Sequence, residues 1–190
     1  HWDCPLVGGD LASLPRDADP LTLTVTVIGS AHAARGPVLR CGAKPGDGIY
    51  VTGKLGGSFD PSTGLGKHLT FDPRLTEARA LADALGANLH AMMDLSDGLG
   101  RDATRMADAS KVRFDIASDL IPCNAIDWRR AASDGEDYEL LFTASGPVPK
   151  LDPQTRTTVT RVGTVSAGSG CFIAEGTSSI NARDLGWEHT

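Results

Sequence analysis

Hydrophobic and polar positions along the chain follow two periods, which predict strands and helices in a mixed order. Apolar residues alternate with threonines over residues 21–29 (LTLTVTVIG), which predicts a half-buried strand. Residues 75–87 and 99–109 place apolar side chains three and four positions apart, so each predicts a helix. Further strands are expected over 49–53, 89–94, 112–116, 138–144, 156–165 and 171–174, and a short helix over 124–132. Because strands and helices do not alternate strictly, we expect an α+β fold, a mixed sheet with helices packed on one face.

The small, polar stretch 30–37 (SAHAARGP) reads as a linker between two regions. We therefore expect a remnant of an N-terminal domain over residues 1–36 and a complete C-terminal α+β domain over residues 37–190. The chain begins at His1 without a recognisable first element. This beginning suggests a fragment, or a gene model that lost its start.

Composition narrows the class of protein. The 190 residues are 41% hydrophobic and 22% charged, as in an ordinary globular protein, and the net charge is −6. Without a basic block, nucleic acid is not expected as a partner. No apolar run reaches bilayer length and no signal peptide is visible, so we expect a cytoplasmic protein without membrane contact. The four cysteines are too far apart in sequence to suggest a zinc cluster or a disulfide framework.

The segment Asp94-Leu95-Ser96-Asp97-Gly98 is the strongest chemical signal in the sequence. It places two carboxylates three residues apart between an apolar strand and a helix. Mg²⁺ takes such oxygen ligands and usually shares them with substrate phosphates, and backbone N–H groups at the start of a helix bind phosphate. The alternative is a structural N-cap, in which Ser96 or Asp97 satisfies the first N–H groups of the helix.

Two further turns carry acids. Gly8-Gly9-Asp10 combines a carboxylate with glycines that let a phosphate approach the backbone, or it is a plain turn. Gly135-Glu136-Asp137-Tyr138 precedes a strong strand and could recognise a cationic or hydroxyl-bearing substrate, or it is a charged loop.

Cationic and aromatic candidates are weaker. Arg40 and Lys44 could meet ATP phosphates, or they are surface charges. Lys67, His68 and Arg74 follow a Gly-rich stretch and could form a lid over anions, although solvated side chains are the simpler interpretation. Near the end of the chain, Trp187 either stacks on a flat ring or docks into the core.

Taken together, these segments resemble a known family. The chain contains, in order, LVGGD, LTLTVTVIG, VLRCGAKPGDGIYVTGKLGGS, HLTFDPR, MMDLSDGL, DGEDYELLFT and GWEH. This combination is similar to the thiamine-monophosphate kinases of the aminoimidazole ribonucleotide synthetase superfamily. The resemblance implies a Mg²⁺-dependent enzyme that transfers the γ-phosphate of ATP to thiamine monophosphate and gives thiamine diphosphate. It also implies a homodimer for full-length members.

The resemblance further implies a role for each matching residue. It implies no catalytic side chain, because the transfer would be in-line and assisted by metal. The implied ATP contacts are Gly9, Arg40 and Ser96. The implied Mg²⁺ ligands are Asp10, Asp94 and Asp97. The implied contacts to the thiamine moiety are Glu136, Asp137 and Trp187.

One feature of the family is missing from the sequence. Members carry an acid-rich G-D-D motif before the G-G-D turn, and nothing here matches it. Two alternatives therefore stay open: another ATP-dependent enzyme of the same superfamily, or a non-catalytic fragment that only binds or dimerises.

Overall fold

A computed structural model describes residues 5, 7–8, 24–124, 127–151 and 157–188 of the chain. The chain divides into two compact units, His1–Ser30 and Ala31–Thr190. Within the described residues, all helices and strands lie in the second unit. The second unit therefore carries the fold and the candidate site. The division after residue 36 stays a prediction.

The strand expected over residues 21–29 is not formed where the structure describes it. Residues 21–23 lie outside the described residues, and residues 24–30 are exposed and belong to no strand. A strand needs a hydrogen-bonded neighbour for its backbone, and no described residue pairs with this segment. Alternation gives β-propensity but supplies no partner, so the prediction was wrong for residues 24–29.

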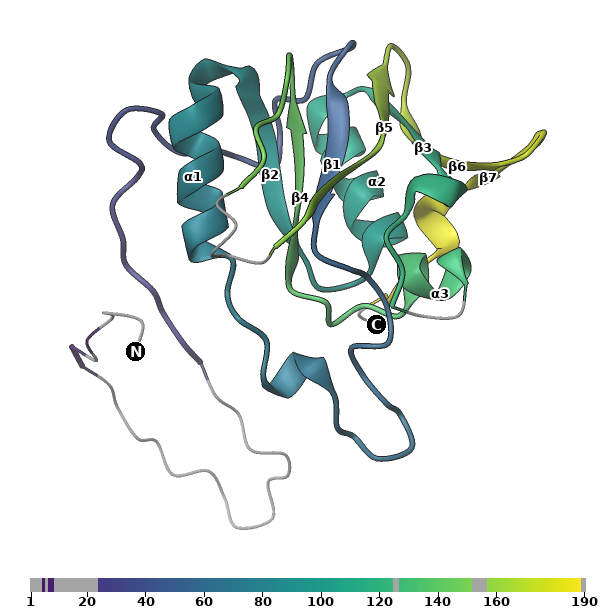
Figure 1. Ribbon diagram of the computed structural model, residues 1–190, viewed down its shortest axis with the longest axis horizontal. Coiled ribbons are helices and arrows are strands. Elements are labelled where there is room, and N and C mark those ends of the chain that lie inside the picture. Colours follow the sequence, from purple (N-terminus) through teal and green to yellow (C-terminus); the bar gives the residue numbers. More distant parts are fainter. Residues whose placement is uncertain (1–4, 6, 9–23, 125–126, 152–156, 189–190) are drawn as a thin grey trace. The chain divides into compact units, whose positions relative to one another are not determined.

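Seven strands of the second unit form one mixed sheet in the order β2-β4-β1-β5-β3-β6-β7 (Figure 1). Neighbouring strands are antiparallel except β3 and β6, which are parallel. The strands are β1 (Gly48–Thr52), β2 (Leu89–Leu95), β3 (Arg113–Ala117), β4 (Glu139–Ala144), β5 (Val159–Ser166), β6 (Gly170–Glu175) and β7 (Ser178–Asn181). The predicted α+β class with a mixed sheet is confirmed.

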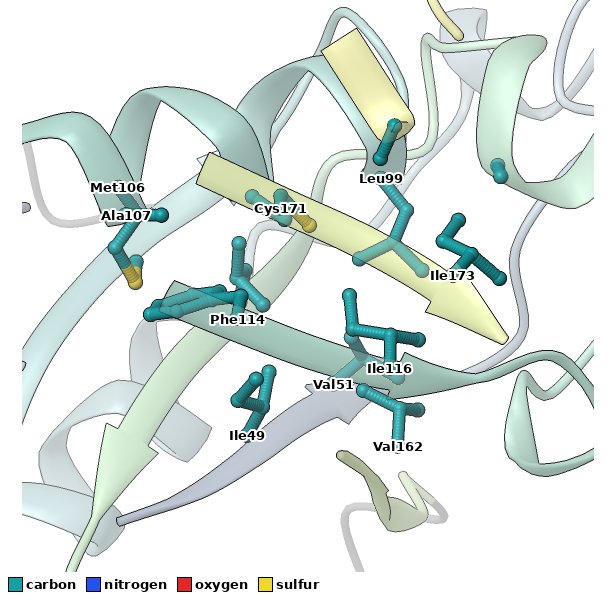
Figure 2. Packing of buried hydrophobic residues seen from close by; sticks show 14 of the residues in the cluster. Ile49, Val51, Leu99, Met106, Ala107, Phe114, Ile116, Val162, Cys171 and Ile173 are labelled. Carbon is teal, nitrogen blue, oxygen red and sulfur yellow. The ribbon is translucent and has the colours of Figure 1, made fainter. Parts of the chain in front are cut away.

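The larger hydrophobic core lies between the sheet and the helices α2 (Leu99–Ser110) and α3 (Trp128–Ser133). The buried side chains of α2 recur at helical spacing, as the sequence pattern predicts. Figure 2 shows how they meet the inward-facing side chains of β1, β3, β5 and β6. The labelled members of this cluster are Ile49, Val51, Leu99, Met106, Ala107, Phe114, Ile116, Val162, Cys171 and Ile173.

Helix α1 (Leu75–Leu85) packs on the opposite face of the sheet. Leu81 and Leu85 form a second core cluster with Phe142 of β4, whereas the adjacent Leu141 belongs to the larger core. Successive strand residues point to opposite faces, so the two clusters lie on either side of β4. The expectation of helices on one face holds for α2 and α3 and is wrong for α1. An apolar stripe shows that a helix is buried but not against which face.

The register of β2 and β4 positions the candidate site. Leu95, the last residue of β2, is opposite Glu139, the first residue of β4. The loop after β2 and the loop before β4 therefore lie side by side at one end of the sheet. The short 3₁₀ helices are η1 (Lys67–Leu69), η2 (Gly86–Asn88), η3 (Ser118–Leu120) and η5 (Ala182–Asp184). Among the described residues, no helix is long and apolar enough to cross a membrane.

Two leucines of α1 give a matched test of the second core. Leu81 is fully buried, whereas the side chain of Leu75 is 48% exposed. Leu81→Ala leaves a cavity and should lower the free energy of unfolding by roughly 2–5 kcal/mol. Leu75→Ala should change it by less than about 1 kcal/mol. Urea unfolding followed by circular dichroism measures both losses of stability. Equal losses would contradict the burial of Leu81 between α1 and the sheet.

Candidate functional site

A pocket of about 330 Å³ opens where the loops after β2 and before β4 meet. Four segments that are far apart in sequence contribute to its wall: the loop between β1 and α1, the turn after β2, the loop after α3, and the last described residues. The lining residues are Phe59, His68, Ser96, Asp97, Asp134, Glu136 and Trp187. The structure thus brings five of the residues singled out in the sequence into one cavity: His68, Ser96, Asp97, Glu136 and Trp187.

The turn after β2 is organised by a carboxylate from the first turn of α2. The buried Asp102 accepts hydrogen bonds from the backbone N–H groups of Ser96 (3.1 Å) and Asp97 (3.0 Å). Burial raises the pKa of Asp102, although these two N–H groups favour its charged form. The N-cap residue of α2 is Gly98, and no side chain caps the helix there. Neither Ser96 nor Asp97 therefore occupies the capping position that the structural alternative requires.

Arg105 balances the charge of this turn. Its guanidinium Nη1 pairs with Asp97 Oδ2 and, at 3.0 Å, with Asp102 Oδ1. The hydrogen bond to Asp97 is the largest contribution that raises the pKa of Arg105. Asp94, the second-last residue of β2, is exposed instead. The two predicted metal ligands of this segment thus differ, since Asp97 is held by a cation and Asp94 faces solvent.

The segment before β4 presents Glu136 to the pocket through unusual backbone conformations. Glu136 and Tyr138 have φ angles of 57° and 51°, which non-glycine residues rarely adopt. The backbone N–H of Glu136 donates to Ser96 O (2.7 Å), and that of Tyr138 donates to Leu95 O (2.8 Å). Such positions persist only where neighbouring structure fixes them, and they cluster at functional sites.

Tyr138 holds the Glu136 carboxylate. Its hydroxyl donates to Glu136 Oε2 at 2.9 Å, and its ring stacks on Phe71. Burial, the hydrogen bond to Glu136 and the nearby charges of Asp94 and Asp97 raise the pKa of Tyr138 to about 12. Among the described residues, no cationic side chain lies within ion-pair distance of Glu136. Glu136 is therefore a pocket carboxylate with a hydroxyl donor and, in the part of the chain that the structure describes, without a counter-charge.

The alternate residues of the same segment point to the loop between β1 and α1. Asp137 is fully buried and accepts hydrogen bonds from the N–H of Gly56 (2.9 Å) and the hydroxyl of Ser58 (2.5 Å). It does not line the pocket. The structure therefore gives Asp137, which the resemblance places at the substrate, a visible role as an anchor for this loop.

Glu139 anchors the far end of the loop. It accepts from Thr52 Oγ1 at 2.8 Å and pairs with Lys67 Nζ and Arg74 Nε, each at 2.7 Å. Burial alone would raise the pKa of Glu139, but the hydrogen bonds from Arg74, Lys67 and Thr52 outweigh it and lower the pKa. Lys67 and Arg74 are thus partners of Glu139, rather than free cations over a bound anion as the sequence allowed.

The end of the chain is attached to the turn after β2 by its backbone. The N–H of Trp187 donates to Asp97 O at 2.8 Å. Gly186 has φ 113°, and a Cβ on it would lie 2.4 Å from the same oxygen, so only glycine allows this approach. Arg101 pairs with Glu188 at 3.4 Å on the outer side. The Trp187 side chain is 65% exposed, which contradicts docking into the core.

Of the predicted site residues that the structure describes, Arg40, Asp94 and Asp137 do not line the pocket. Arg40 is exposed. Gly9 and Asp10 lie outside the described residues. Within the part of the chain that the structure describes, no three His, Cys, Asp or Glu side chains gather closely enough to hold a metal ion.

Sequence reasoning missed Phe59 and Asp134 as pocket residues and Asp102 and Arg105 as partners of Asp97. Asp102 and Arg105 lie three residues apart on α2, so their shared helix face was visible in the sequence. Nothing local marks Phe59 or Asp134, because the pocket forms only when four separate segments meet.

The fold is an α+β domain with a mixed sheet, and an acidic and aromatic pocket lies beside its strand ends. The chain belongs to the family described as AIR synthase related protein, C-terminal domain, whose model matches residues 44–175. This family assignment agrees with the resemblance inferred from the sequence.

Within this family, the chain is similar to several thiamine-monophosphate kinases. The thiamine-monophosphate kinase of Rhodopirellula baltica is 33% identical over 192 residues, which cover 94% of this chain and 57% of that protein. That of Escherichia coli K12 is 35% identical and covers 80% of this chain and 50% of its own length. The solved structure "AaThiL complexed with AMPPCP and TMP" superposes with a TM-score of 0.58 at 28% identity, over 80% of this chain and 54% of that one. The chain spans about half the length of the relatives that it matches.

Asp137 gives the site a testable pH dependence. Burial raises its pKa from 3.8 to about 6, although hydrogen bonds from Ser58 and Gly56 favour the charged form. Between about pH 4 and 6 the folded chain therefore binds a proton that the unfolded chain has lost. The stabilisation is complete below this window and is lost as pH rises through it. Relative to Asp137→Asn, the parent should lose roughly 3 kcal/mol of unfolding free energy from about pH 4 to pH 7.

Urea unfolding of both proteins across this pH range measures the difference. Asp119→Asn, an exposed aspartate in η3, is the control and should follow the parent at every pH. If the Asp137→Asn and parent curves stay parallel, Asp137 does not titrate in this window.

Proposed function

We propose that this chain carries part of the active site of a thiamine-monophosphate kinase, which transfers the γ-phosphate of ATP to thiamine monophosphate and gives thiamine diphosphate. The observation that carries the proposal is the pocket that joins Glu136 and Trp187 to the turn of Ser96 and Asp97. One cavity thus combines groups suited to a cationic ring with groups suited to metal and phosphate.

The ring-binding end consists of Glu136 and Trp187. The thiazolium ring of thiamine carries a positive charge, and Glu136 is a carboxylate without a counter-ion among the described residues. An aromatic face adds roughly 0.5–2 kcal/mol to the binding of a cation. The exposed indole of Trp187 is available for this contact. We assign Asp137 to the support of this end, since it holds the loop that carries Phe59.

The phosphate-binding end begins at the turn after β2. We propose that Asp94 and Asp97 would hold Mg²⁺, and that Ser96 and Arg40 would contact ATP. The same roles for Asp10 and Gly9, which lie outside the described residues, stay predictions. The donors fit the ion, because Mg²⁺ prefers oxygen ligands and takes only one or two protein carboxylates beside substrate phosphates and water. Bound Mg²⁺ would reduce the repulsion between the two polyanions and align them for in-line transfer.

The chain does not need a general base for this reaction. The acceptor is a phosphate oxygen, which is largely ionised at neutral pH because its second pKa is about 6. The work of the protein is to position two charged substrates, and the buried Asp102 contributes by fixing Ser96 and Asp97. The cytoplasmic location and the homodimer of the complete protein stay predictions.

The aspartates of the turn test the metal end. Asp94→Asn and Asp97→Asn each remove a charge that Mg²⁺ would use, so each should weaken Mg²⁺-dependent binding of an ATP analogue about tenfold or more. Isothermal titration with and without Mg²⁺ measures the effect. Asp119→Asn is the control for loss of one surface carboxylate. If both variants bind like the parent, or if they only unfold, the turn is structural.

Trp187 tests the ring end. Trp187→Ala should weaken the binding of thiamine monophosphate about tenfold, equivalent to roughly 1.4 kcal/mol, and leave the ATP analogue unaffected. Trp128→Ala is the control for loss of an indole elsewhere, since Trp128 lies on α3 outside the pocket and packs against the larger core. Equal loss of both ligands would contradict the assignment. Absence of thiamine monophosphate binding in the parent would favour another ATP-dependent enzyme of the superfamily or a non-catalytic fragment.

A further inference from the structure

The loop between β1 and α1 carries a small, well-defined hairpin. Asp60 and Leu65 form an isolated antiparallel bridge, with the Asp60 N–H donating to Leu65 O at 2.9 Å. The Asp60 carboxylate accepts from the N–H (2.9 Å) and the hydroxyl (2.7 Å) of Ser62. These hydrogen bonds lower the pKa of Asp60. This part of the Gly-rich stretch is thus a hydrogen-bonded turn, and it fixes the backbone next to Phe59.

The base of the hairpin is attached to the segment before β4. Asp134 accepts from the N–H of Gly57 (3.0 Å), and Asp137 accepts from Gly56 and Ser58. Three consecutive residues of the loop are therefore held by two carboxylates that flank Glu136. The loop that carries Phe59 is attached in this way to the segment that presents Glu136.

Phe59 and His68 form an aromatic pair at this position. Their rings meet edge to face, with centroids 5.2 Å apart and planes at 75°. The His68 N–H donates to Ser58 O at 3.1 Å, which closes the loop behind the pair. Both residues line the pocket, and Phe59 remains 39% exposed. An exposed phenyl ring on a braced loop is poised to contact a ligand.

The charge of the lining selects the kind of ligand. Three of the seven lining residues are carboxylates, none is Lys or Arg, and His68 is the single basic side chain among them. Arg105 and Arg130 pair with Asp97 and Asp134 from outside the lining. Among the described residues, Glu136 has no such cationic partner.

We propose that Phe59 is a specificity-determining residue, which contacts a planar cationic ring together with Trp187 and selects for it. Resting on the proposed function, this ring is that of the acceptor substrate. Phe59 lies on the loop that Asp134 and Asp137 hold, and Trp187 lies on the segment held by Asp97 O. Phe59 and Trp187 thus lie on two separate segments, and Glu136 lies on a third segment, before β4.

The test compares three substitutions of Phe59 by isothermal titration. Phe59→Ala should weaken the binding of thiamine, and of thiamine monophosphate, about five- to tenfold. Phe59→Leu keeps apolar volume without the ring and should weaken binding about threefold or more, whereas Phe59→Tyr should retain the affinity of the parent. Leu65→Ala is the control, because Leu65 is exposed on the same hairpin and does not line the pocket. Thermal melting checks each variant, and the Leu and Tyr variants decide the question if Phe59→Ala fails to fold.

A second planar cation, N-methylnicotinamide, separates this inference from the proposed function. If thiamine monophosphate binds and all Phe59 variants bind it equally, the role of Phe59 is overturned and the kinase proposal stands. If only N-methylnicotinamide binds the parent, and does so less well to Phe59→Ala and Phe59→Leu, the aromatic selection stands and the kinase proposal fails. If neither ring compound binds the parent, the aromatic selection is overturned.

Discussion

The backbone of two residues, Ser96 and Asp97, holds the candidate site together. Their two N–H groups donate to the buried carboxylate of Asp102. Their two carbonyl oxygens accept from the N–H groups of Glu136 and Trp187. All four polar backbone groups of this turn are thereby satisfied, and each of the outgoing bonds fixes a segment that bears a pocket residue. Buried backbone groups must be paired, so the turn could not keep its shape if either neighbouring segment moved away.

Alternate residues of the segment before β4 connect this turn to the rest of the site. Glu136 faces the pocket, whereas Asp137 and Glu139 face the loop between β1 and α1. One short run of acids therefore supplies both a ligand-facing charge and two anchors. This arrangement requires a left-handed backbone at Glu136 and Tyr138, which is unfavourable for non-glycine residues. The hydrogen bonds from Glu136 N–H to Ser96 O and from Tyr138 N–H to Leu95 O hold the backbone in this conformation.

Electrostatics separates the carboxylates of the site by role. Asp97 and Asp134 have arginine partners, and Asp137 is buried with hydrogen-bond donors from the loop. Desolvation disfavours a charge unless donors or counter-charges compensate it, which explains why the buried acids are those with several partners. Glu136 has a single hydroxyl donor among the described residues. The pocket thus keeps one carboxylate whose charge is left for a ligand.

The sequence by itself determined the elements of the second unit and the chemistry of its motifs. Periodicity locates α1, α2 and most strands of the sheet to within a few residues, because burial of one face imposes that spacing. The motifs of the sequence also mark Ser96, Asp97 and Glu136, because acids beside strand ends stand out locally, and Trp187 as a large aromatic residue. The tertiary structure alone decided that α1 covers the other face of the sheet, that residues 24–30 form no strand, and that Asp137 turns away from the pocket. It alone placed Phe59 beside these residues. Such outcomes depend on partners distant in sequence, and a local pattern records what a residue can bury or bind but not which segment will meet it.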